Sequence, residues 1–173
     1  MNKSFKGEYV SFAVRLLKRI APLFLLLLLV IFKLYYGRLA HGNFVQYRVY
    51  FLIFMSVCVL IGIYYHTDKI RTVVNEIIFS DTQLHIIGQD FTSKYEDSLD
   101  LEKLILEIQS EELGRNKTRY CLEIYADDKY YYLNKFNDWN YKTLVEVVDE
   151  FKSRTGKSVA GMEYYSQLKE SNS

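Results

Sequence analysis

Residues 20–36 read IAPLFLLLLLVIFKLYY and form a leucine-rich run near the start of the chain. No charge interrupts the run before Lys33, whose stem can extend toward a membrane interface, and Tyr35 and Tyr36 favour the same depth. A length of about 17 residues lies near the lower limit for crossing a bilayer. The run therefore predicts a first transmembrane helix.

A second apolar run, residues 49–65, reads VYFLIFMSVCVLIGIYY and is also uncharged. Tyr64 and Tyr65 close it at the depth that tyrosine prefers. Because only residues 37–48 separate the two runs, we predict a tight helical hairpin with a short extracytoplasmic loop. A cleaved signal peptide is the alternative for the first run, but no small-x-small cleavage pattern follows it.

The distribution of basic residues predicts which side of the membrane holds the termini. Five Lys or Arg residues precede the first run, two lie in the loop 37–48, and Lys69 and Arg71 follow the second run. Because cytoplasmic segments carry the excess of Lys and Arg, both termini are expected in the cytoplasm. The sequence thus predicts a multi-pass protein of the inner (plasma) membrane, with the lipid bilayer as a partner.

Residues 1–19 form a basic N-terminal segment with an amphipathic pattern. Large apolar residues recur at helical spacing, at Phe5, Tyr9, Phe12, Leu16 and Ile20. Two interpretations stay open: a helix lying in the inner interface with its bases near lipid phosphates, or an extension of the first transmembrane helix. The candidate membrane-interface residues are Arg15, Lys18, Arg19, Lys33, Tyr35, Tyr36, Tyr64 and Tyr65.

Charge divides the chain into a basic membrane half and an acidic soluble half. Through residue 74 there are ten bases and two acids, a formal charge of +8, and the remainder has twelve bases and nineteen acids, a formal charge of −7. Neutralising phosphates requires clustered Lys and Arg, so the acidic half is not expected to bind nucleic acid. Residues 66–73 are the predicted linker between the halves.

After residue 74 the pattern changes to that of β-strands. Short apolar runs bounded by turn residues predict strands near residues 76–79, 84–87 and 91–95, and residues 101–108 fit either a strand or a short helix. Residues 119–125 and 129–133 alternate around Asp127 and Asp128, which predicts an antiparallel hairpin.

An amphipathic helix is predicted from about residue 139 to residue 154, with Asn137 or Asp138 as its cap and Gly156 at its end. The polar tail, residues 157–173, is expected to be loose. The fold class predicted for the chain is a membrane α-helical hairpin followed by an α+β domain over residues 74–156. In that domain the helix caps a bent antiparallel sheet or partial barrel.

Residues 99–108, LDLEKLILEI, the tyrosine-rich hairpin and the terminal helix containing Trp139 together resemble a bacterial pleckstrin-homology-like (PH-like) domain. Small bacterial membrane proteins with two N-terminal spans and such a domain are a recurring type. The resemblance implies a bent sheet of about seven strands capped by a helix, and a binding or scaffolding module rather than a catalyst. Phosphoinositide-binding relatives carry basic early loops, but residues 80–82 and 89–90 are not basic, so headgroup recognition is not carried over.

The sequence contains no recognisable catalytic, metal or cofactor motif. His41, His66 and His85 are scattered, and no pair has metal-ligand spacing. Asp127 and Asp128 are adjacent acids of a turn, where neighbouring side chains point apart. We therefore expect no enzyme activity, no metal ion and no cofactor.

Aromatic residues are the candidate partner contacts. In Tyr130-Tyr131-Tyr132, strand alternation sends Tyr131 to one face and its neighbours to the other, so at least one ring is expected at a surface or a contact. Packing against the helix is the alternative explanation. Trp139 lies off the apolar stripe of the predicted helix and is the fourth candidate.

Three functions fit these observations. The leading hypothesis is a non-enzymatic interaction module at the cytoplasmic face of the membrane, which binds a protein or a second copy in an oligomer. The rival is a two-span effector whose β-rich domain senses a ligand, such as a nucleotide signal, and which then oligomerises and disrupts the bilayer. The third is an immunity-like protein that neutralises a membrane-acting toxin.

Overall fold

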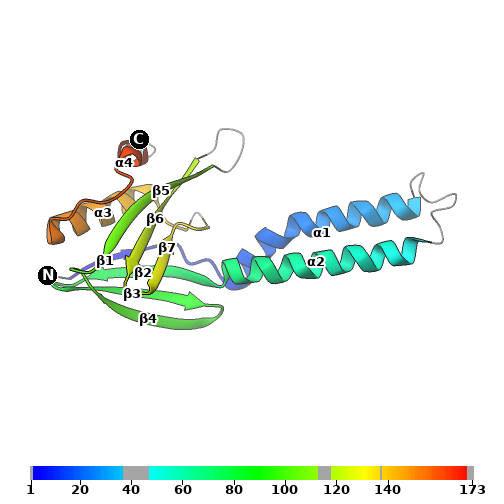
Figure 1. The fold of residues 1–173 in the computed structure, drawn as a ribbon, viewed down its shortest axis with the longest axis horizontal. Helices are drawn as coiled ribbons and strands as arrows, with labels where there is room; N and C mark the ends of the chain where they lie inside the picture. The colour runs from blue at the N-terminus through cyan, green and yellow to red at the C-terminus, as the bar shows by residue number, and fades with distance from the viewer. Residues whose placement is uncertain (1, 37–46, 113–117, 137, 171–173) are drawn as a thin grey trace. The chain divides into compact units, whose positions relative to one another are not determined.

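The computed structural model describes residues 2–36, 47–112, 118–136 and 138–170. The chain divides into two compact units (Figure 1). We call Ser11–Arg71 the helical unit, and we call Met1–Val10 together with Thr72–Ser173 the β-rich unit.

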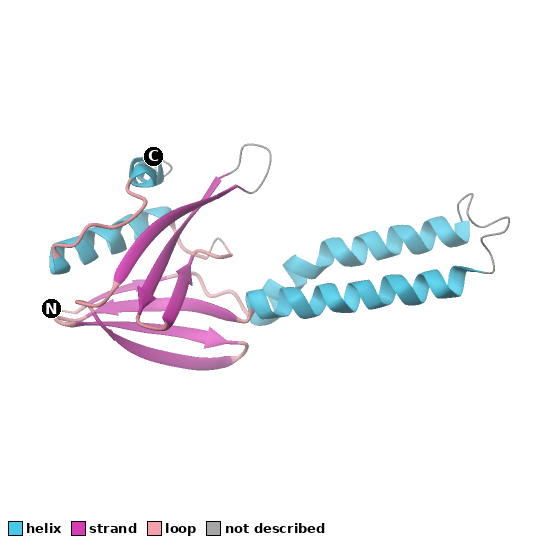
Figure 2. Ribbon diagram, in the orientation of Figure 1, coloured by secondary structure: helices cyan, strands magenta, loops and turns pink. Residues whose placement is uncertain are grey.

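The helical unit consists of two helices, α1 (Phe12–Tyr36) and α2 (Arg48–Ile70), which pack side by side (Figure 2). Gly62 lies at their contact, where an added Cβ atom would approach the Cδ1 atom of Leu23 to 3.2 Å. A small residue at this point lets the two backbones come close, as in membrane helix pairs.

Apolar side chains cover the outer faces of this helix pair. The exposed large apolar residues include Leu25, Leu28, Phe32, Ile53, Phe54 and Leu60. Contact with water would be unfavourable by about 25 cal/mol for each Å² of this surface. A helix that is apolar all round is typical of a protein core or a membrane span.

By length and composition, α2 is the one described helix that is long and apolar enough to cross a membrane, over Val49–Thr67, of which 6% is buried. The prediction of two spans is therefore supported for the second run only. α1 extends back to Phe12 and includes three bases in its first turns. Its uncharged segment, residues 20–32, has 13 residues, about 20 Å of helix, against a hydrocarbon core of about 30 Å.

Four strands form the first sheet of the β-rich unit, in the antiparallel order β1-β2-β3-β4. Their bounds are β1 (Lys3–Lys6), β2 (Thr72–Phe79), β3 (Gln83–Asp90) and β4 (Ser93–Asp100). β1 precedes α1 in the chain, yet it pairs with β2, which follows α2. The helical unit is therefore inserted between two neighbouring strands of one sheet.

This pairing corrects the prediction of a helical segment over residues 1–19. Phe5 is buried in the core and lies opposite Ile77, with its ring edge-on to Phe79 at 5.9 Å between centroids. The apolar partners of β2 stabilise an extended conformation at residues 3–6, whereas an interfacial helix would place Phe5 in lipid. The β-rich domain thus begins before the helices, and its second strand begins at Thr72 rather than at residue 74.

Three strands form the second sheet, in the antiparallel order β5-β6-β7. Their bounds are β5 (Ile105–Glu112), β6 (Thr118–Ala126) and β7 (Lys129–Leu133). The predicted β6–β7 hairpin is confirmed: Ala126 pairs with Lys129 around a two-residue turn, in which Asp127 has a φ of 51°. Glu111 and Glu112 belong to β5 rather than to the expected loop.

Two helices follow the strands, α3 (Tyr141–Thr155) and α4 (Glu163–Glu170). Gly156 ends α3 in the left-handed conformation, as predicted. The cap of α3 is Asn140, whose side chain accepts a hydrogen bond from the Lys142 N–H at 2.8 Å, so the predicted cap residues are wrong. The tail is not loose throughout, because Leu168 on α4 is buried in the core.

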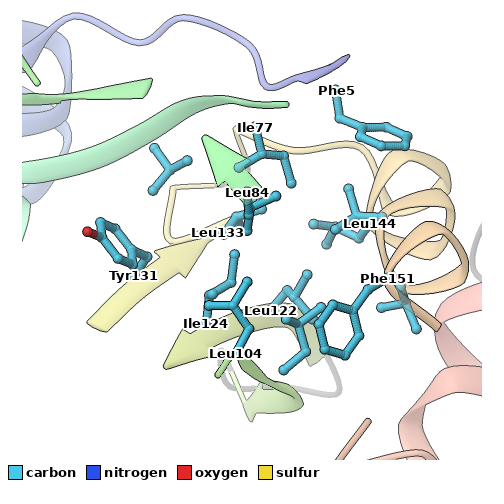
Figure 3. Packing of buried hydrophobic residues seen from close by; sticks show 14 of the residues in the cluster. Phe5, Ile77, Leu84, Leu104, Leu122, Ile124, Tyr131, Leu133, Leu144 and Phe151 are labelled. Carbon is cyan, nitrogen blue, oxygen red and sulfur yellow. The ribbon is translucent and has the colours of Figure 1, made fainter. Parts of the chain in front are cut away.

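The hydrophobic core lies between the two sheets and α3 (Figure 3). Ile77 and Leu84 come from the first sheet, Leu122 and Ile124 from the second, and Phe151 from α3, and all five are fully buried. Burying such a side chain contributes about 1.5–3 kcal/mol. The predicted α+β class is therefore correct: two antiparallel sheets share one core with the C-terminal helices.

Candidate functional site

The two edges of the second sheet differ in how they are covered. At β5, the Ile108 N–H donates to Ala160 O at 2.9 Å, and the Ala160 N–H donates to Leu106 O at 3.0 Å. At the opposite edge, β7 pairs with β6 alone among the described strands. Unpaired edges template the addition of another strand, so β7 is the edge of this sheet that is open to a partner.

A cleft of about 470 Å³ lies beside β7. Its lining comes from β2, β3, β4, β7 and the segment after β7: Thr72, Val73, Val74, Asp90, Tyr95, Asp97, Lys129, Tyr130, Tyr131, Tyr132 and Lys135. The volume lies within the usual range for ligand pockets. The cleft therefore joins both sheets at the open edge.

Asp97 on β4 bridges the cleft to β7. Its carboxylate forms an ion pair with Lys129 and accepts a hydrogen bond from the Tyr131 hydroxyl at 2.8 Å. The hydrogen bond from Lys129 and the one from Tyr131 hold the pKa of Asp97 below its ordinary value. Burial and the Asp97 charge raise the pKa of Tyr131, so its hydroxyl stays protonated as a donor.

Tyr95 forms the floor of the cleft by lying across Gly88. A Cβ atom at Gly88 would lie 2.4 Å from the Tyr95 hydroxyl and 2.4 Å from Val73 O. The Tyr95 hydroxyl is 3.4 Å from Val73 O, and its ring stacks on Tyr131 at 6.4 Å between centroids. Burial, followed by the charges of Asp97 and Asp90, raises the pKa of Tyr95 to about 12. Glycine is thus required here for the tyrosine to pack.

The outer face of the second sheet carries a second group of tyrosines. Across β5, β6 and β7 the register forms two adjacent rows, the first Ile105–Tyr125–Tyr130 and the second Glu107–Glu123–Tyr132. The ring of Tyr130 lies 5.2 Å from that of Tyr125 and 6.3 Å from that of Tyr132, between centroids. We call these six residues the tyrosine–glutamate face.

Glu123 is the buried acid of this face. It is 5% exposed, although it points away from the core. Its carboxylate accepts hydrogen bonds from the hydroxyls of Tyr125 and Tyr130, the latter at 2.7 Å. The Glu123 hydrogen bond raises the pKa of Tyr125 to about 12, and burial with Glu123 raises that of Tyr130.

Beyond the tyrosine–glutamate face, the side chains form closed contacts. The Tyr132 hydroxyl lies 2.7 Å from the Sγ atom of Cys121, and Arg119 forms an ion pair with Glu111. Burial raises the pKa of the Cys121 thiol, which disfavours the nucleophilic thiolate. This part of the sheet is therefore structural.

A second cleft, of about 420 Å³, lies at the start of β3 and the end of α3. Its two bases bind the backbone: Arg154 donates to Ser80 O at 2.8 Å, and Lys157 donates to Leu104 O at 3.3 Å. Arg154 also forms an ion pair with Glu150. These contacts hold the loops together, so we place the candidate site at β7.

The four predicted partner contacts have different positions. Tyr130 is 52% exposed and Tyr132 is partly exposed, both on the outer face, whereas Tyr131 points into the cleft and is buried. The predicted alternation is thus confirmed. Trp139 is 3% exposed, and its indole N–H donates to Val74 O at 3.0 Å. The prediction of Trp139 as a partner contact is therefore wrong, because its polar atom fastens α3 to β2.

Sequence reasoning missed the acids and tyrosines that surround these residues. Asp97 and Tyr95 come from β4, and only tertiary packing brings them to β7. Glu123 and Tyr125 were within reach of the sequence, because hairpin alternation places them on the same face as Tyr130.

The predicted membrane-interface residues are also divided. Lys18, Arg19 and Lys33 are exposed, and so are Tyr64 and Tyr65. The side chains of Tyr35 and Tyr36 lie outside the described residues.

Arg15 differs from the other predicted interface bases. It is 1% exposed, and its guanidinium donates to Ile70 O at 2.7 Å. The prediction that Arg15 faces lipid phosphates is wrong, because it binds the last carbonyl of α2. There its charge complements the negative end of the helix dipole.

Within the described residues, His, Cys, Asp and Glu side chains form no group that could hold a metal ion. Cys58 and Cys121 are both free. A scan against protein-family models finds no match to this sequence, and a search of curated proteins finds none either.

Proposed function

We propose that this chain is a membrane-anchored, non-enzymatic interaction module that binds a protein by strand addition at β7. The observation that carries the proposal is the open edge of β7 beside a cleft of about 470 Å³. In strand addition, an extended segment bonds to an unpaired edge through its backbone, and pockets for alternate side chains supply selectivity. Tyr95, Asp97 and Tyr131 face such a pocket from two sheets.

The order of elements supports a PH-like fold for the β-rich unit. A PH-like domain is expected to have about seven strands in a bent sheet, followed by a capping helix. The described residues hold β1 to β7 in two antiparallel sheets and then α3. In this proposal the helical unit is an insertion between the first and the second strand.

The proposal places both α1 and α2 across the inner membrane, with the β-rich unit in the cytoplasm. The exposed leucines of α1 and the small residue Gly62 at its contact with α2 favour a membrane pair. Lys33, near the end of α1, can extend its stem to the interface. Lys18 and Arg19, exposed at the start of α1, suit the basic cytoplasmic side.

The rival function, a nucleotide-sensing effector that disrupts the bilayer, requires a site for an anion. Lys129 at the cleft already forms an ion pair with Asp97, and Asp90 also lines the cleft. This charge balance favours a peptide over an anionic ligand. An immunity-like protein would act by binding a toxin, so the same edge of β7 would serve it.

Photocrosslinking from the site tests the proposal. In full-length protein in native membranes, p-benzoylphenylalanine replaces Tyr130, and in a control it replaces Glu146, an exposed residue of α3. After irradiation we expect discrete adducts of higher mass from position 130 and none from position 146. Monomer alone at position 130, or the same adducts from both positions, would overturn the proposal.

A further inference from the structure

Two acids of the tyrosine–glutamate face oppose each other without a basic partner. Glu107 on β5 and Glu123 on β6 are direct cross-strand partners. Among the described residues, neither carboxylate forms an ion pair with Lys or Arg, and the hydrogen-bond donors to Glu123 are tyrosine hydroxyls. Like charges directly opposite each other destabilise a sheet, so this pair would be relieved by a cation from outside.

The rings beside these acids can receive such a cation. The face of a tyrosine ring attracts an ammonium or guanidinium group held within about 6 Å of its centroid. Tyr130 is 52% exposed, and its hydroxyl binds the buried carboxylate of Glu123 at 2.7 Å. A cation on Tyr130 would therefore feel both the ring and the charge behind it.

The same face is also apolar at its first row. Ile105 is 60% exposed, and Tyr130 lies in the same row across the sheet, with Tyr125 between them. Exposed apolar residues that adjoin one another mark interaction surfaces more often than scattered ones do. The face thus combines apolar contact area with negative charge.

Strand addition at β7 would bring alternate side chains of the added segment onto this face. On one face of an antiparallel pair, opposite Cβ atoms lie about 4.5–5.5 Å apart, and every second residue shares the face. Those side chains would lie beside Tyr130 and Tyr132. The β-rich unit has 14 bases and 20 acids (12 + 2 and 19 + 1 over residues 75–173 and 1–10), a formal charge of −6. This charge favours a basic partner.

We propose that the tyrosine–glutamate face receives the Lys or Arg side chains of a basic, extended segment of a protein partner that is added to β7. This inference rests on the strand addition proposed above. It commits the occupant to alternating basic and apolar residues, with the cations beside Tyr130 and Glu123.

Peptide binding to the full-length protein tests this inference. The protein is held in nanodiscs of phosphatidylcholine, which carry no net charge, and binding is followed by fluorescence anisotropy with a neutral dye. The probes are Lys-Val-Lys-Val-Lys-Val, the acidic Glu-Val-Glu-Val-Glu-Val, and Lys-Pro-Lys-Pro-Lys-Pro, whose prolines lack N–H donors. Empty nanodiscs control for binding to lipid.

Three variants locate the binding site. We expect Glu123→Gln to weaken Lys-Val binding by about fivefold or more, and Tyr130→Leu by about two- to fivefold, the worth of one exposed cation–π contact. Glu146→Gln makes the same change of charge on an exposed part of α3 and should leave binding unchanged. Circular dichroism verifies that each variant is folded. Should a variant unfold, the comparison of basic and acidic peptides on the wild-type protein still decides.

The outcomes separate the inference from the proposed function. Preference for Lys-Val over Glu-Val by at least about tenfold, lost in Glu123→Gln, supports the cation face. Equal binding of Lys-Val and Glu-Val overturns the cation face and leaves strand addition standing. Equal binding of Lys-Val and Lys-Pro overturns strand addition, because proline cannot form the ladder. Absence of binding by every peptide overturns both.

Discussion

Gly156 and Gly161 offer a matched pair of alanine substitutions that measures how firmly the C-terminal segment covers the edge of β5. Both residues have a positive φ, 67° at Gly156 and 74° at Gly161. A Cβ atom at Gly156 would meet nothing within 4 Å, whereas one at Gly161 would lie 2.0 Å from Ile108 O. Since that oxygen belongs to the backbone of β5, it cannot rotate away.

The two variants therefore differ by the clash alone. Gly156→Ala carries the cost of a left-handed residue with a Cβ atom, about 1–2 kcal/mol. Gly161→Ala carries the same cost plus the clash, which is relieved if residues 157–170 detach. Detachment loses two backbone hydrogen bonds and the burial of Val159 and Leu168, about 4–9 kcal/mol together. Regained conformational entropy, about 1–2 kcal/mol per residue, offsets most of this loss, so we expect the clash to exceed the net docking energy.

Hydrogen exchange followed by mass spectrometry of the full-length protein in detergent is the assay. In Gly161→Ala we expect amide protection to fall across residues 157–170 and at Ile108, whose N–H donates to Ala160 O. In Gly156→Ala we expect protection there to remain. Equal protection in the two variants would refute the reasoning, because it would mean that β5 moves to admit the methyl group at little cost.

Three further substitutions test individual contacts. Asp97→Asn should lower the free energy of unfolding by about 1 kcal/mol at neutral pH. The folded-state pKa of Asp97 is depressed, so its contribution is present above the unfolded pKa of about 3.9 and is lost as the pH falls through the folded value. The variant should lack that step in an acid titration of stability. Trp139→Phe leaves Val74 O without its donor, and thermal melting should report a loss of about 1–3 kcal/mol. Gly88→Ala forces the Tyr95 ring off β3 and should cost about 1–3 kcal/mol, while restoration by Tyr95→Ala would identify the ring as the obstacle.

Local patterns predicted the parts of the fold in which neighbours in sequence are also neighbours in space. The β6–β7 hairpin follows from alternation around Asp127 and Asp128, and that alternation also separates Tyr131 from Tyr130. Gly156 ends α3 because a left-handed residue favours glycine. Each of these features depends on a few consecutive residues.

The sequence could not reveal contacts between distant segments. Phe5 repeats at helical spacing with later apolar residues, but its strand partner is Ile77, beyond both helices. Arg15 reads as an exposed base until α2 brings Ile70 O within 2.7 Å. Asp97 and Tyr131 meet only because the two sheets share a core. Most of the candidate site belongs to this class, so its tyrosines were predictable and its acids were not.

The strand edges of the β-rich unit show why β7 stands apart. Natural proteins protect sheet edges with charge, short length or a covering segment. β1 has only four residues, and the chain after it continues the contacts, since the Glu8 N–H donates to Asp138 O at 2.6 Å. β4 alternates buried residues with the exposed charges of Lys94 and Glu96. β5 is covered through Ala160.

β7 has none of these protections over its middle. Its charged residue, Lys129, stands at the turn and is engaged by Asp97, while Tyr130 and Tyr132 give the strand a partly exposed aromatic face. An exposed aromatic edge next to a cleft is a liability for aggregation unless something occupies it. The protections at β1, β4 and β5 therefore argue that the exception at β7 is retained for a partner. They also lead to a contrast with Gly161→Ala, which would uncover β5 and give the sheet a second open edge.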